Sequence, residues 1–355
     1  MPIAQPNTLR MVFWETTSAC NLKCRHCRAS ATGDRPSNEL TLGQSRELLR
    51  AIADFAKPVI VLSGGEPLVR PDIYDIASCG TRLGLRMVLA TNGTMLDKSS
   101  AKDIKAAGIQ RVSVSIDGAD AACHDAFRGV AGAFDSAFSG IEHLKSVDMP
   151  FQINTSITRA NIKQLPQILD MAISGGACAL HLFMLVPTGC GKEIPEDEMI
   201  SADEYESVLN WIYDSSKSAP INLKATCAPH YFRVVKQRGK VESGEWRAKG
   251  HEGHPLTAET KGCLAGSAVC FVSYKGDVYP CGYFPVSAGN VLQEPFQQIW
   301  ECSELFQQLR DPSLLTGKCG RCEYSRVCGG CRARAYARTG DYLSEEPYCA
   351  YTPYK

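Results

Sequence analysis

Six apolar stretches rich in Val, Ile and Leu recur along the first half of the chain, and each is followed by a polar tail. Most lack clean polar alternation, which is typical of strands buried on both faces of a parallel sheet. Amphipathic stretches at 41–56, 99–108 and 161–176 lie between them and predict helices. Such repeats predict right-handed crossovers in a barrel or an open α/β sheet. The predicted strands are residues 10–17, 59–64, 86–93, 111–118, 151–158 and 179–187.

Six units are two short of the eight in a full barrel, so we expect a partial (β/α)6 TIM-like barrel over residues 1–215. Residues 201–236 predict helices, and the polar, glycine-rich stretch 237–262 predicts a loop. We therefore expect a helical and loop linker over 216–262. A small cysteine-rich domain is expected over 263–355, which contains nine of the 17 cysteines.

The composition excludes some functions and favours others. The 38 basic and 38 acidic residues cancel, which argues against binding to nucleic acid. No apolar stretch approaches the roughly 20 residues of a membrane span, and the first residues lack a signal-peptide pattern. We expect a soluble cytoplasmic protein with no membrane partner. In that reducing compartment clustered cysteines bind metal rather than form disulfides, and iron–sulfur chemistry is favoured. Buried core positions are expected for Cys79, Cys123, Cys178 and Cys302.

Two motifs follow the first two predicted strands. Cys20, Cys24 and Cys27 supply three thiols where a [4Fe–4S] cluster normally takes four, which leaves one iron open. An incomplete zinc finger or a group of core cysteines is the alternative. SGGEP at 63–67 has paired glycines that let a ligand approach the backbone, and Glu66 can accept hydrogen bonds from an ammonium group. Loops after parallel strands meet at one edge of the sheet, so we expect one site.

These motifs, with the strand ends ATNG and SIDG, resemble those of the radical S-adenosylmethionine (SAM) enzymes. In that family SAM chelates the open iron, and its reductive cleavage gives a 5′-deoxyadenosyl radical that abstracts a hydrogen atom from the substrate. The resemblance implies that the three cysteines hold this cluster. His26 departs from the usual aromatic residue but keeps a planar ring. The implied SAM-binding residues are Gly64, Gly65, Glu66, Pro67, Thr91, Asn92, Ser115, Asp117 and Asn154.

The cysteines of the tail form a third motif. Its two Cys-x2-Cys pairs would suit a zinc ribbon when taken alone. In their full order the tail cysteines resemble the SPASM extension of radical SAM enzymes, although the last pair is separated by two residues instead of three. The resemblance implies two fully ligated auxiliary [4Fe–4S] clusters that carry electrons, and hence three clusters in all. The first would use Cys263, Cys270, Cys281 and Cys331, and the second Cys319, Cys322, Cys328 and Cys349.

Segments 180–199, 224–235 and 328–349 resemble the heme synthases of the siroheme-dependent pathway. Those enzymes oxidatively decarboxylate two propionates of iron-coproporphyrin III to the vinyls of heme b. The resemblance implies a tetrapyrrole substrate and an electron donor such as flavodoxin or ferredoxin. Cys227 and His230 are candidate ligands of the porphyrin iron. Candidate partners of the substrate carboxylates are Lys192, Lys224, Arg233, Arg332 and Arg334.

Other functions stay open at this point. A peptide-modifying SPASM maturase is one alternative, but such enzymes often begin with a peptide-recognition domain, and only nine residues precede the first predicted strand. A didecarboxysiroheme deacetylase is a second. A non-catalytic iron–sulfur electron carrier or a zinc-binding interaction module belongs to a different class. The three-cysteine site beside GGEP argues against both of these, because neither needs SAM.

Overall fold

A ten-stranded sheet organises the computed structural model, which describes residues 7–194, 196–241 and 262–354. The strand order is β10-β9-β8-β1-β2-β3-β4-β5-β6-β7, and β1 to β7 run parallel to one another. The strands are β1 (Met11–Glu15), β2 (Val59–Ser63), β3 (Arg86–Thr91), β4 (Val112–Ser115), β5 (Phe151–Ile157), β6 (Ala179–Met184), β7 (Asn222–Thr226), β8 (Val269–Val272), β9 (Asp277–Tyr279) and β10 (Gly289–Asn290).

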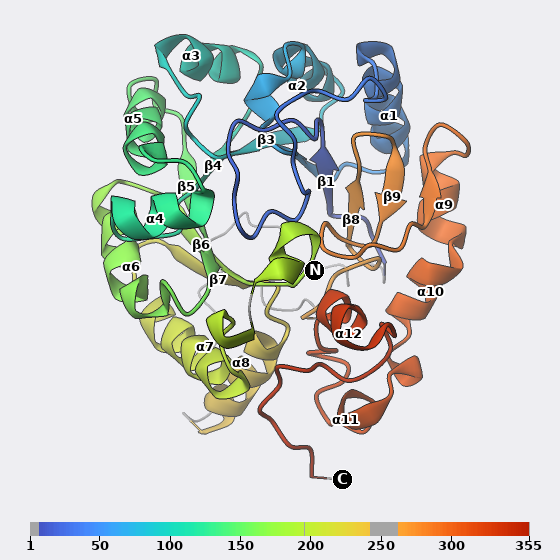
Figure 1. Cartoon of the computed structure of the whole chain (residues 1–355). Helices are drawn as coiled ribbons and strands as arrows, with labels where there is room; N and C mark the ends of the chain where they lie inside the picture. Colours follow the sequence, from blue (N-terminus) through green and yellow to red (C-terminus); the bar gives the residue numbers. More distant parts are fainter. Residues whose placement is uncertain (1–6, 195, 242–261, 355) are drawn as a thin grey trace.

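Helices surround the outer side of the curved sheet (Figure 1). The α-helices are α1 (Leu42–Phe55), α2 (Ile73–Arg82), α3 (Lys98–Ala106), α4 (Ala121–Arg128), α5 (Ala133–Lys145), α6 (Leu165–Ser174), α7 (Ala202–Ser216), α8 (His230–Val241), α9 (Phe296–Cys302), α10 (Glu304–Arg310), α11 (Gly317–Gly320) and α12 (Arg332–Thr339). The 3-10 helices are η1 (Pro67–Val69), η2 (Ile162–Gln164), η3 (Gly189–Glu193), η4 (Glu196–Glu198) and η5 (Pro312–Leu314).

Local sequence signals explain where several helices begin. Thr41 and Gln44 form a reciprocal capping box at the start of α1, because the Thr41 side chain accepts from the Gln44 N–H while Gln44 Oε1 accepts from the Thr41 N–H. Ser201 and Glu204 do the same for α7. The strands between the helices are apolar and mostly buried, as their sequences predicted. The predicted α/β class with a partial barrel is therefore confirmed.

The C-terminal region continues the barrel sheet. Strand β8 lies parallel to β1, with Cys270 opposite Val12, and β9 and β10 follow as antiparallel strands. In Figure 1 the orange β8 and β9 stand beside the blue β1. Within the described residues no strand pairing joins β7 to β10, so the sheet is open.

Some expectations were wrong in detail. Residues 222–226 form β7 instead of starting a helix, because pairing with β6, including Leu223 with Leu180, outweighs the helical preference of Lys and Ala. The predicted loop 237–262 begins later, since α8 runs to Val241; residues 242–261 lie outside the described part. Cys178 and Cys302 are exposed and Cys123 is half-buried instead of buried; Cys79 is buried as expected.

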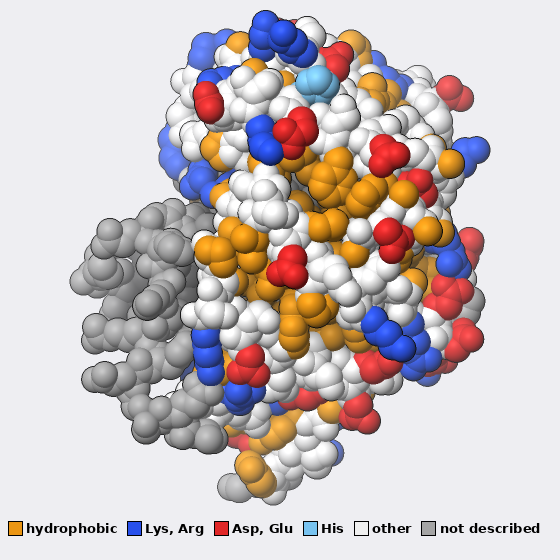
Figure 2. All heavy atoms as spheres, turned by 90° about the vertical axis from the view of Figure 1, so that its left-hand side faces the viewer, with side chains coloured by type: hydrophobic (Ala, Val, Ile, Leu, Met, Phe, Trp, Pro, Cys, Tyr) orange, Lys and Arg blue, Asp and Glu red, His pale blue; other side chains and the backbone are white. Residues whose placement is uncertain are grey.

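The described surface mixes charges of both signs. Figure 2 shows the side that carries α4, α5 and α6, where basic and acidic side chains are interspersed and hydrophobic side chains gather across the middle. Among the described helices, none combines the length and the apolar character that crossing a membrane requires.

Candidate active site

A cavity of about 1140 Å³ lies against the face of the sheet that points away from its helices. Strand β1 shows the division, because Val12 and Trp14 pack in the hydrophobic core while Met11 and Phe13 line the cavity. The volume exceeds the roughly 300–1,000 Å³ of most small-molecule sites. There is room for more than one ligand.

Cys20, Cys24 and Cys27, in the loop between β1 and α1, line this cavity. The backbone N–H of Leu22 donates to Cys20 Sγ at 3.4 Å, and that of Ala31 donates to Cys27 Sγ at 3.4 Å. Burial raises the pKa of Cys20 to about 11 and also raises the pKa of Cys24. Thiols in this setting ionise when a metal is bound beside them. The three sulfurs therefore fit the open iron–sulfur cluster that the sequence predicted.

The SGGEP turn packs directly under this loop. The Gly65 N–H donates to the Thr17 carbonyl at 2.8 Å, and the Glu66 N–H donates to the Ala19 carbonyl at 2.7 Å. A Cβ on Gly64, whose φ is 154°, would collide with the Thr17 carbonyl oxygen, and one on Gly65 would collide with that of Ala19. The paired glycines thus admit the backbone of the cysteine loop, and both also line the cavity.

Glu66 joins the end of β2 to the end of β3. Its Oε1 accepts from Thr91 Oγ1 at 2.8 Å and from the Leu68 N–H at 3.1 Å, and its Oε2 accepts from the Asn92 N–H at 2.8 Å. The side chain is completely buried, and burial raises the pKa of its carboxyl. Asn92 Nδ2 lies 3.9 Å from Cys20 Sγ, so the same strand end also touches the cysteine loop.

Asp117, at the end of β4, anchors a cation beside the cysteines. Its Oδ2 lies 2.6 Å from Arg128 Nη2, and Arg128 Nη1 lies 3.8 Å from Cys24 Sγ. Burial raises the pKa of Asp117, but Arg128 and then His26 outweigh it, so this pKa is lowered overall. The His26 ring stacks on Phe127 with centroids 4.0 Å apart, and burial lowers its pKa to about 4. His26 is therefore a neutral planar ring at pH 7.

The predicted SAM-binding residues fall into two groups. Six of them line the cavity: Gly64, Gly65, Thr91, Asn92, Ser115 and Asn154. The other three, Glu66, Pro67 and Asp117, are buried behind its wall, where Glu66 and Asp117 hold Asn92 and Arg128. Arg128 lines the cavity but was missed by the sequence analysis. The only signal for it was its place on the helix that follows the SIDG strand end.

The tail cysteines predicted to hold the first auxiliary cluster are not all brought together. Cys263, Cys281 and Cys331 line the large cavity. Cys270 does not, because it lies inside β8 in the core of the sheet with no exposed surface. Cys227, in the loop between β7 and α8, does line the cavity. Burial raises the pKa of the Cys227 thiol far above its ordinary value, and the nearby Cys331, Cys281 and Cys263 raise it further.

The four cysteines predicted for the second auxiliary cluster do lie together, around a small separate cavity. Backbone N–H groups donate to three of these sulfurs at 3.4 Å each, from Tyr324, Gly330 and Glu346. Hydrogen bonds of this kind favour the thiolate form that a cluster requires. The cysteines around this cavity are Cys319, Cys322, Cys328 and Cys349.

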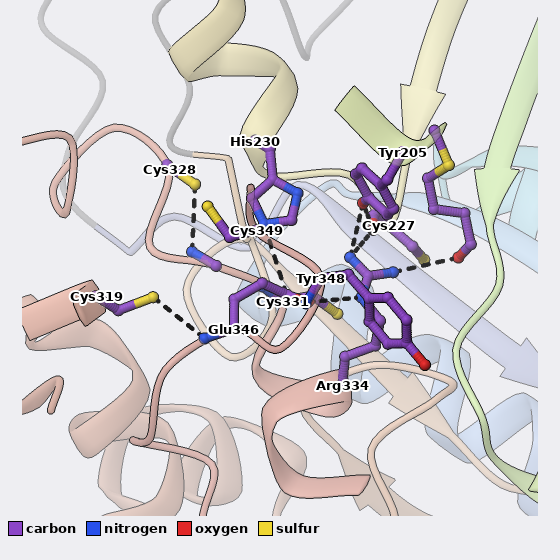
Figure 3. A network of polar contacts seen from close by, with 12 residues as sticks. Tyr205, Cys227, His230, Cys319, Cys328, Cys331, Arg334, Glu346, Tyr348 and Cys349 are labelled. Atoms are coloured by element: carbon purple, nitrogen blue, oxygen red, sulfur yellow. Dashed lines mark hydrogen bonds and ion pairs between the residues drawn. The ribbon is translucent and has the colours of Figure 1, made fainter. Parts of the chain in front are cut away.

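Arg334 on α12 makes a buried ion pair with Glu346, seen at the centre of Figure 3. Its Nε donates to Glu346 Oε1 at 3.0 Å, and its Nη2 donates to the Tyr205 hydroxyl at 2.8 Å and to the Cys227 carbonyl at 2.7 Å. Tyr205 is on α7, so Arg334 connects the C-terminal region to the barrel.

Glu346 continues this network to both groups of tail cysteines (Figure 3). Its Oε2 accepts from the Cys331 N–H at 2.6 Å, and its own N–H donates to Cys319 Sγ. Burial raises the pKa of Glu346, but Arg334 and then His230 outweigh it, so the pKa is lowered overall. Glu346 had no sequence signal, because it looks like an ordinary surface acid in the stretch SEEPYC.

Two predicted lysine contacts to the substrate differ in position. Lys224 on β7 lines the large cavity, and burial lowers its pKa to about 8. Lys192, on η3, is exposed and lies outside that cavity lining.

Apart from Cys227, the other predicted substrate residues lie outside the lining of the large cavity. Arg233 pairs with Glu206, and Arg332 donates to two backbone carbonyl oxygens at 2.8 and 2.7 Å. Arg334 belongs to the network just described. His230 is buried beside the second group of cysteines, and burial lowers its pKa to about 3.

Within the described residues, no three His, Cys, Asp or Glu side chains are grouped tightly enough to hold one metal ion. A four-iron cluster takes one thiolate on each iron, so its ligands stand further apart than those of a single ion.

Two family models match the chain. Residues 14–172 match the radical SAM superfamily, and residues 263–332 match the iron–sulfur cluster-binding domain called SPASM.

Individual relatives extend these matches to the whole chain. The AdoMet-dependent heme synthase of Methanosarcina barkeri is 53% identical over 99% of both chains. The enzyme of the same name from Nitratidesulfovibrio vulgaris is 46% identical over 98% of this chain and 93% of the relative. Among solved structures, Streptococcus suis SuiB bound to S-adenosylmethionine superposes with a TM-score of 0.75, at 17% identity, over 97% of this chain and 78% of that one. At that identity the likeness concerns the fold.

Proposed function

Because this chain belongs to the radical SAM superfamily and carries a SPASM domain, we propose that it is a heme synthase acting on iron-coproporphyrin III. The observation that carries this proposal is the 53% identity, over 99% of both chains, to the AdoMet-dependent heme synthase of Methanosarcina barkeri. From each of two propionates the reaction removes one hydrogen atom, one electron and carbon dioxide, and it leaves a vinyl group.

Cys20, Cys24 and Cys27 would hold the cluster that binds SAM, and their sulfurs on the cavity wall fit that task. Together with SAM, this cluster supplies one-electron chemistry that ends in the abstraction of a hydrogen atom. Gly64 and Gly65, with the ends of β3, β4 and β5, line the adjoining part of the cavity and would hold SAM. Glu66 and Asp117 act behind them, as the frame that keeps Asn92 and Arg128 in place.

Three clusters per chain are part of the proposal. The electron left by each decarboxylation needs an acceptor close to the substrate. Cys263, Cys281 and Cys331 line the same cavity as the SAM-binding cysteines, which supports an auxiliary cluster within reach of the substrate. The second group, around Cys319 and Cys349, adjoins it through Glu346. Electrons could then leave the active site through the C-terminal region.

The substrate would occupy the cavity between these two sets of thiols. A tetrapyrrole is a large planar ligand, and the cavity volume of about 1140 Å³ suits it beside SAM. Lys224 lines that cavity, and the structure gives it no hydrogen bond or ion pair within the described residues. Lys224 is half-buried, and an ammonium removed from bulk water without an anionic partner is costly, so a propionate carboxylate would supply the missing partner. Lys224 is therefore the proposed carboxylate contact.

Activity on iron-coproporphyrin III tests the proposal directly. The reconstituted protein is incubated anaerobically with SAM, a chemical reductant and iron-coproporphyrin III, and the products are analysed by mass spectrometry. We expect heme b, with two 5′-deoxyadenosines formed for each heme. A control without SAM should give neither product. Formation of 5′-deoxyadenosine without any loss of carbon dioxide from the porphyrin would exclude this substrate.

The remaining partners are proposed on chemical grounds. A low-potential donor such as flavodoxin or ferredoxin would reduce the SAM-binding cluster. A cytoplasmic location suits the many cysteine thiols, which a reducing compartment keeps from forming disulfides. Replacing the chemical reductant by each reduced donor protein, and comparing the rates of heme formation, tests the first of these proposals.

A further inference from the structure

Apart from Cys20, Cys24 and Cys27, which are assigned to the SAM-binding cluster, Cys227 is the one described cysteine from outside the tail that lines the large cavity. It follows directly after β7, and the large cavity is lined by Cys227 together with Cys263, Cys281 and Cys331. These are four thiols, the number that a closed [4Fe–4S] cluster takes. The three partners come from the C-terminal region, whereas Cys227 comes from the loop that follows β7.

The backbone of Cys227 is held in an unusual conformation. Its φ is 54°, in the left-handed region that residues other than glycine rarely adopt. Two side chains fix its carbonyl oxygen, since the Tyr205 hydroxyl donates to it at 3.1 Å and Arg334 Nη2 donates at 2.7 Å. Strain of this size persists where the surrounding structure imposes it, and such residues cluster at functional sites. The backbone of Cys227 is therefore held from two sides, by Tyr205 on α7 and by Arg334 on α12.

Cys270 has the opposite environment. It has no exposed surface, it lies inside β8 between two neighbouring strands, and it is absent from the cavity wall. Its neighbours Val269 and Phe271 line the cavity, so the alternation of side chains along β8 directs Cys270 to the opposite face of the sheet.

We propose that Cys227 is the fourth thiolate of the first auxiliary cluster, together with Cys263, Cys281 and Cys331. This rests on the proposed function, which supplies the cluster itself. The cluster would then tie the end of β7 to the C-terminal region. With its thiol bound to cluster iron, Cys227 is not the ligand of the porphyrin iron, and this cluster has no open iron for the substrate.

A matched pair of variants tests the assignment. C227A and C270A are prepared anaerobically beside the wild-type chain, and iron, sulfide and electron paramagnetic resonance spectra are measured on each. We expect about twelve irons in the wild type and in C270A, four for each of three clusters. C227A should lose about four irons, or should show the signal of a [3Fe–4S] cluster after oxidation. Full iron content with unchanged spectra in C227A would overturn the proposal, as would loss of a cluster in C270A alone.

A measurement on the wild type keeps the test independent of how the variants fold. Cysteine alkylation is followed by peptide mass spectrometry in the anaerobic holoprotein and after iron is removed with a chelator. Cys227 should be protected in the holoprotein and alkylated once iron is gone. Equal alkylation in both forms would contradict its ligand role. If the wild type itself contains fewer than three clusters, the cluster count of the proposed function fails; if it contains three and Cys227 is unprotected, only the present inference fails.

Discussion

The cysteine loop after β1 and the cysteines of the C-terminal region build their sites in different ways. Cys20, Cys24 and Cys27 lie within eight residues of one another, and two of their sulfurs receive N–H groups from the same loop. The thiols that line the other part of the cavity come from positions as far apart as Cys227 and Cys331. A local loop can leave one place open for a ligand. A site assembled from distant segments also fastens those segments to each other.

The largest contrast should appear when one cysteine of the loop is removed. C24A should abolish 5′-deoxyadenosine formation, because two thiols no longer hold the cluster that binds SAM. The C-terminal clusters should remain, at about eight irons per chain. Iron analysis and product detection by chromatography check both points. C302A, which changes an exposed cysteine, is the control and should retain both properties. Loss of all iron in C24A would mean that the two regions are not independent.

The ion pair between Arg334 and Glu346 should carry the next largest effect, on stability. E346Q leaves the buried Arg334 without its counter-ion, which typically costs about 3–5 kcal/mol. E142Q breaks the exposed pair with Lys145 and should cost at most about 1 kcal/mol. Anaerobic thermal unfolding measures both variants. Equal midpoints for the two variants would show that the buried pair does not hold the C-terminal region.

The same pair predicts a pH dependence. Burial raises the pKa of Glu346 in the folded protein, but Arg334 outweighs burial, so this pKa is lowered overall. Ionised Glu346 therefore stabilises the fold at pH values above 4.5, the ordinary pKa of this carboxyl. That contribution is lost as the pH falls through the folded pKa. The difference in unfolding midpoint between the wild type and E346Q should therefore be constant near neutral pH and should shrink below about pH 4.5. A difference that grows on acidification would contradict this sign.

A smaller effect is expected at the substrate carboxylates. K224M should weaken binding of iron-coproporphyrin III about 10- to 100-fold, since a hydrogen bond to a charged group contributes about 1.5–3 kcal/mol. K192M alters an exposed lysine away from the cavity and should bind normally. Burial lowers the pKa of Lys224 to about 8, so affinity should also fall above pH 8 in the wild type but not in K224M. Absorbance titration of the porphyrin measures all three.

The smallest effect is expected at His26. Burial keeps this ring neutral at pH 7, with a pKa of about 4; the ring stacks on Phe127, and its Nε2 lies 3.7 Å from Asp117 Oδ2. H26F preserves a planar ring, and its rate should stay within a few-fold of the wild type. H26A removes the stack and is the comparison variant. A loss in H26F as large as that in H26A would show that the imidazole nitrogens matter and that the planar ring alone does not suffice.

The sequence best predicted the features that are determined by short segments of the chain. The spacing of Cys20, Cys24 and Cys27 and the six apolar strands are local patterns, and the structure has these strands and places the three cysteines on one cavity. Strand β7 was missed because its residues favour a helix until β6 pairs with them. Cys227 was singled out, but as a contact to the porphyrin iron.

The partners of buried charges were the hardest to predict. Arg334 was predicted to bind a carboxylate of the substrate. In the structure it pairs with Glu346 of the same chain, a contact that forms only when the C-terminal segment folds back onto α12. Arg128 likewise depends on Asp117, which reaches it only after β4 and α4 have packed. Such ion pairs form only when distant segments pack together, and the spacing of residues along the chain does not predict which segments meet.

The pairing of β1 with β8 has a consequence for how the chain is made. During synthesis on the ribosome β1 is made before the other strands. One of its edges has no pairing partner until β8, which begins at Val269, has also been synthesised. Until then that edge exposes unpaired N–H and C=O groups, and pairing partners so distant along the chain slow folding. The nascent barrel therefore passes through a stage at risk of aggregation, which the last strands of the sheet bring to an end.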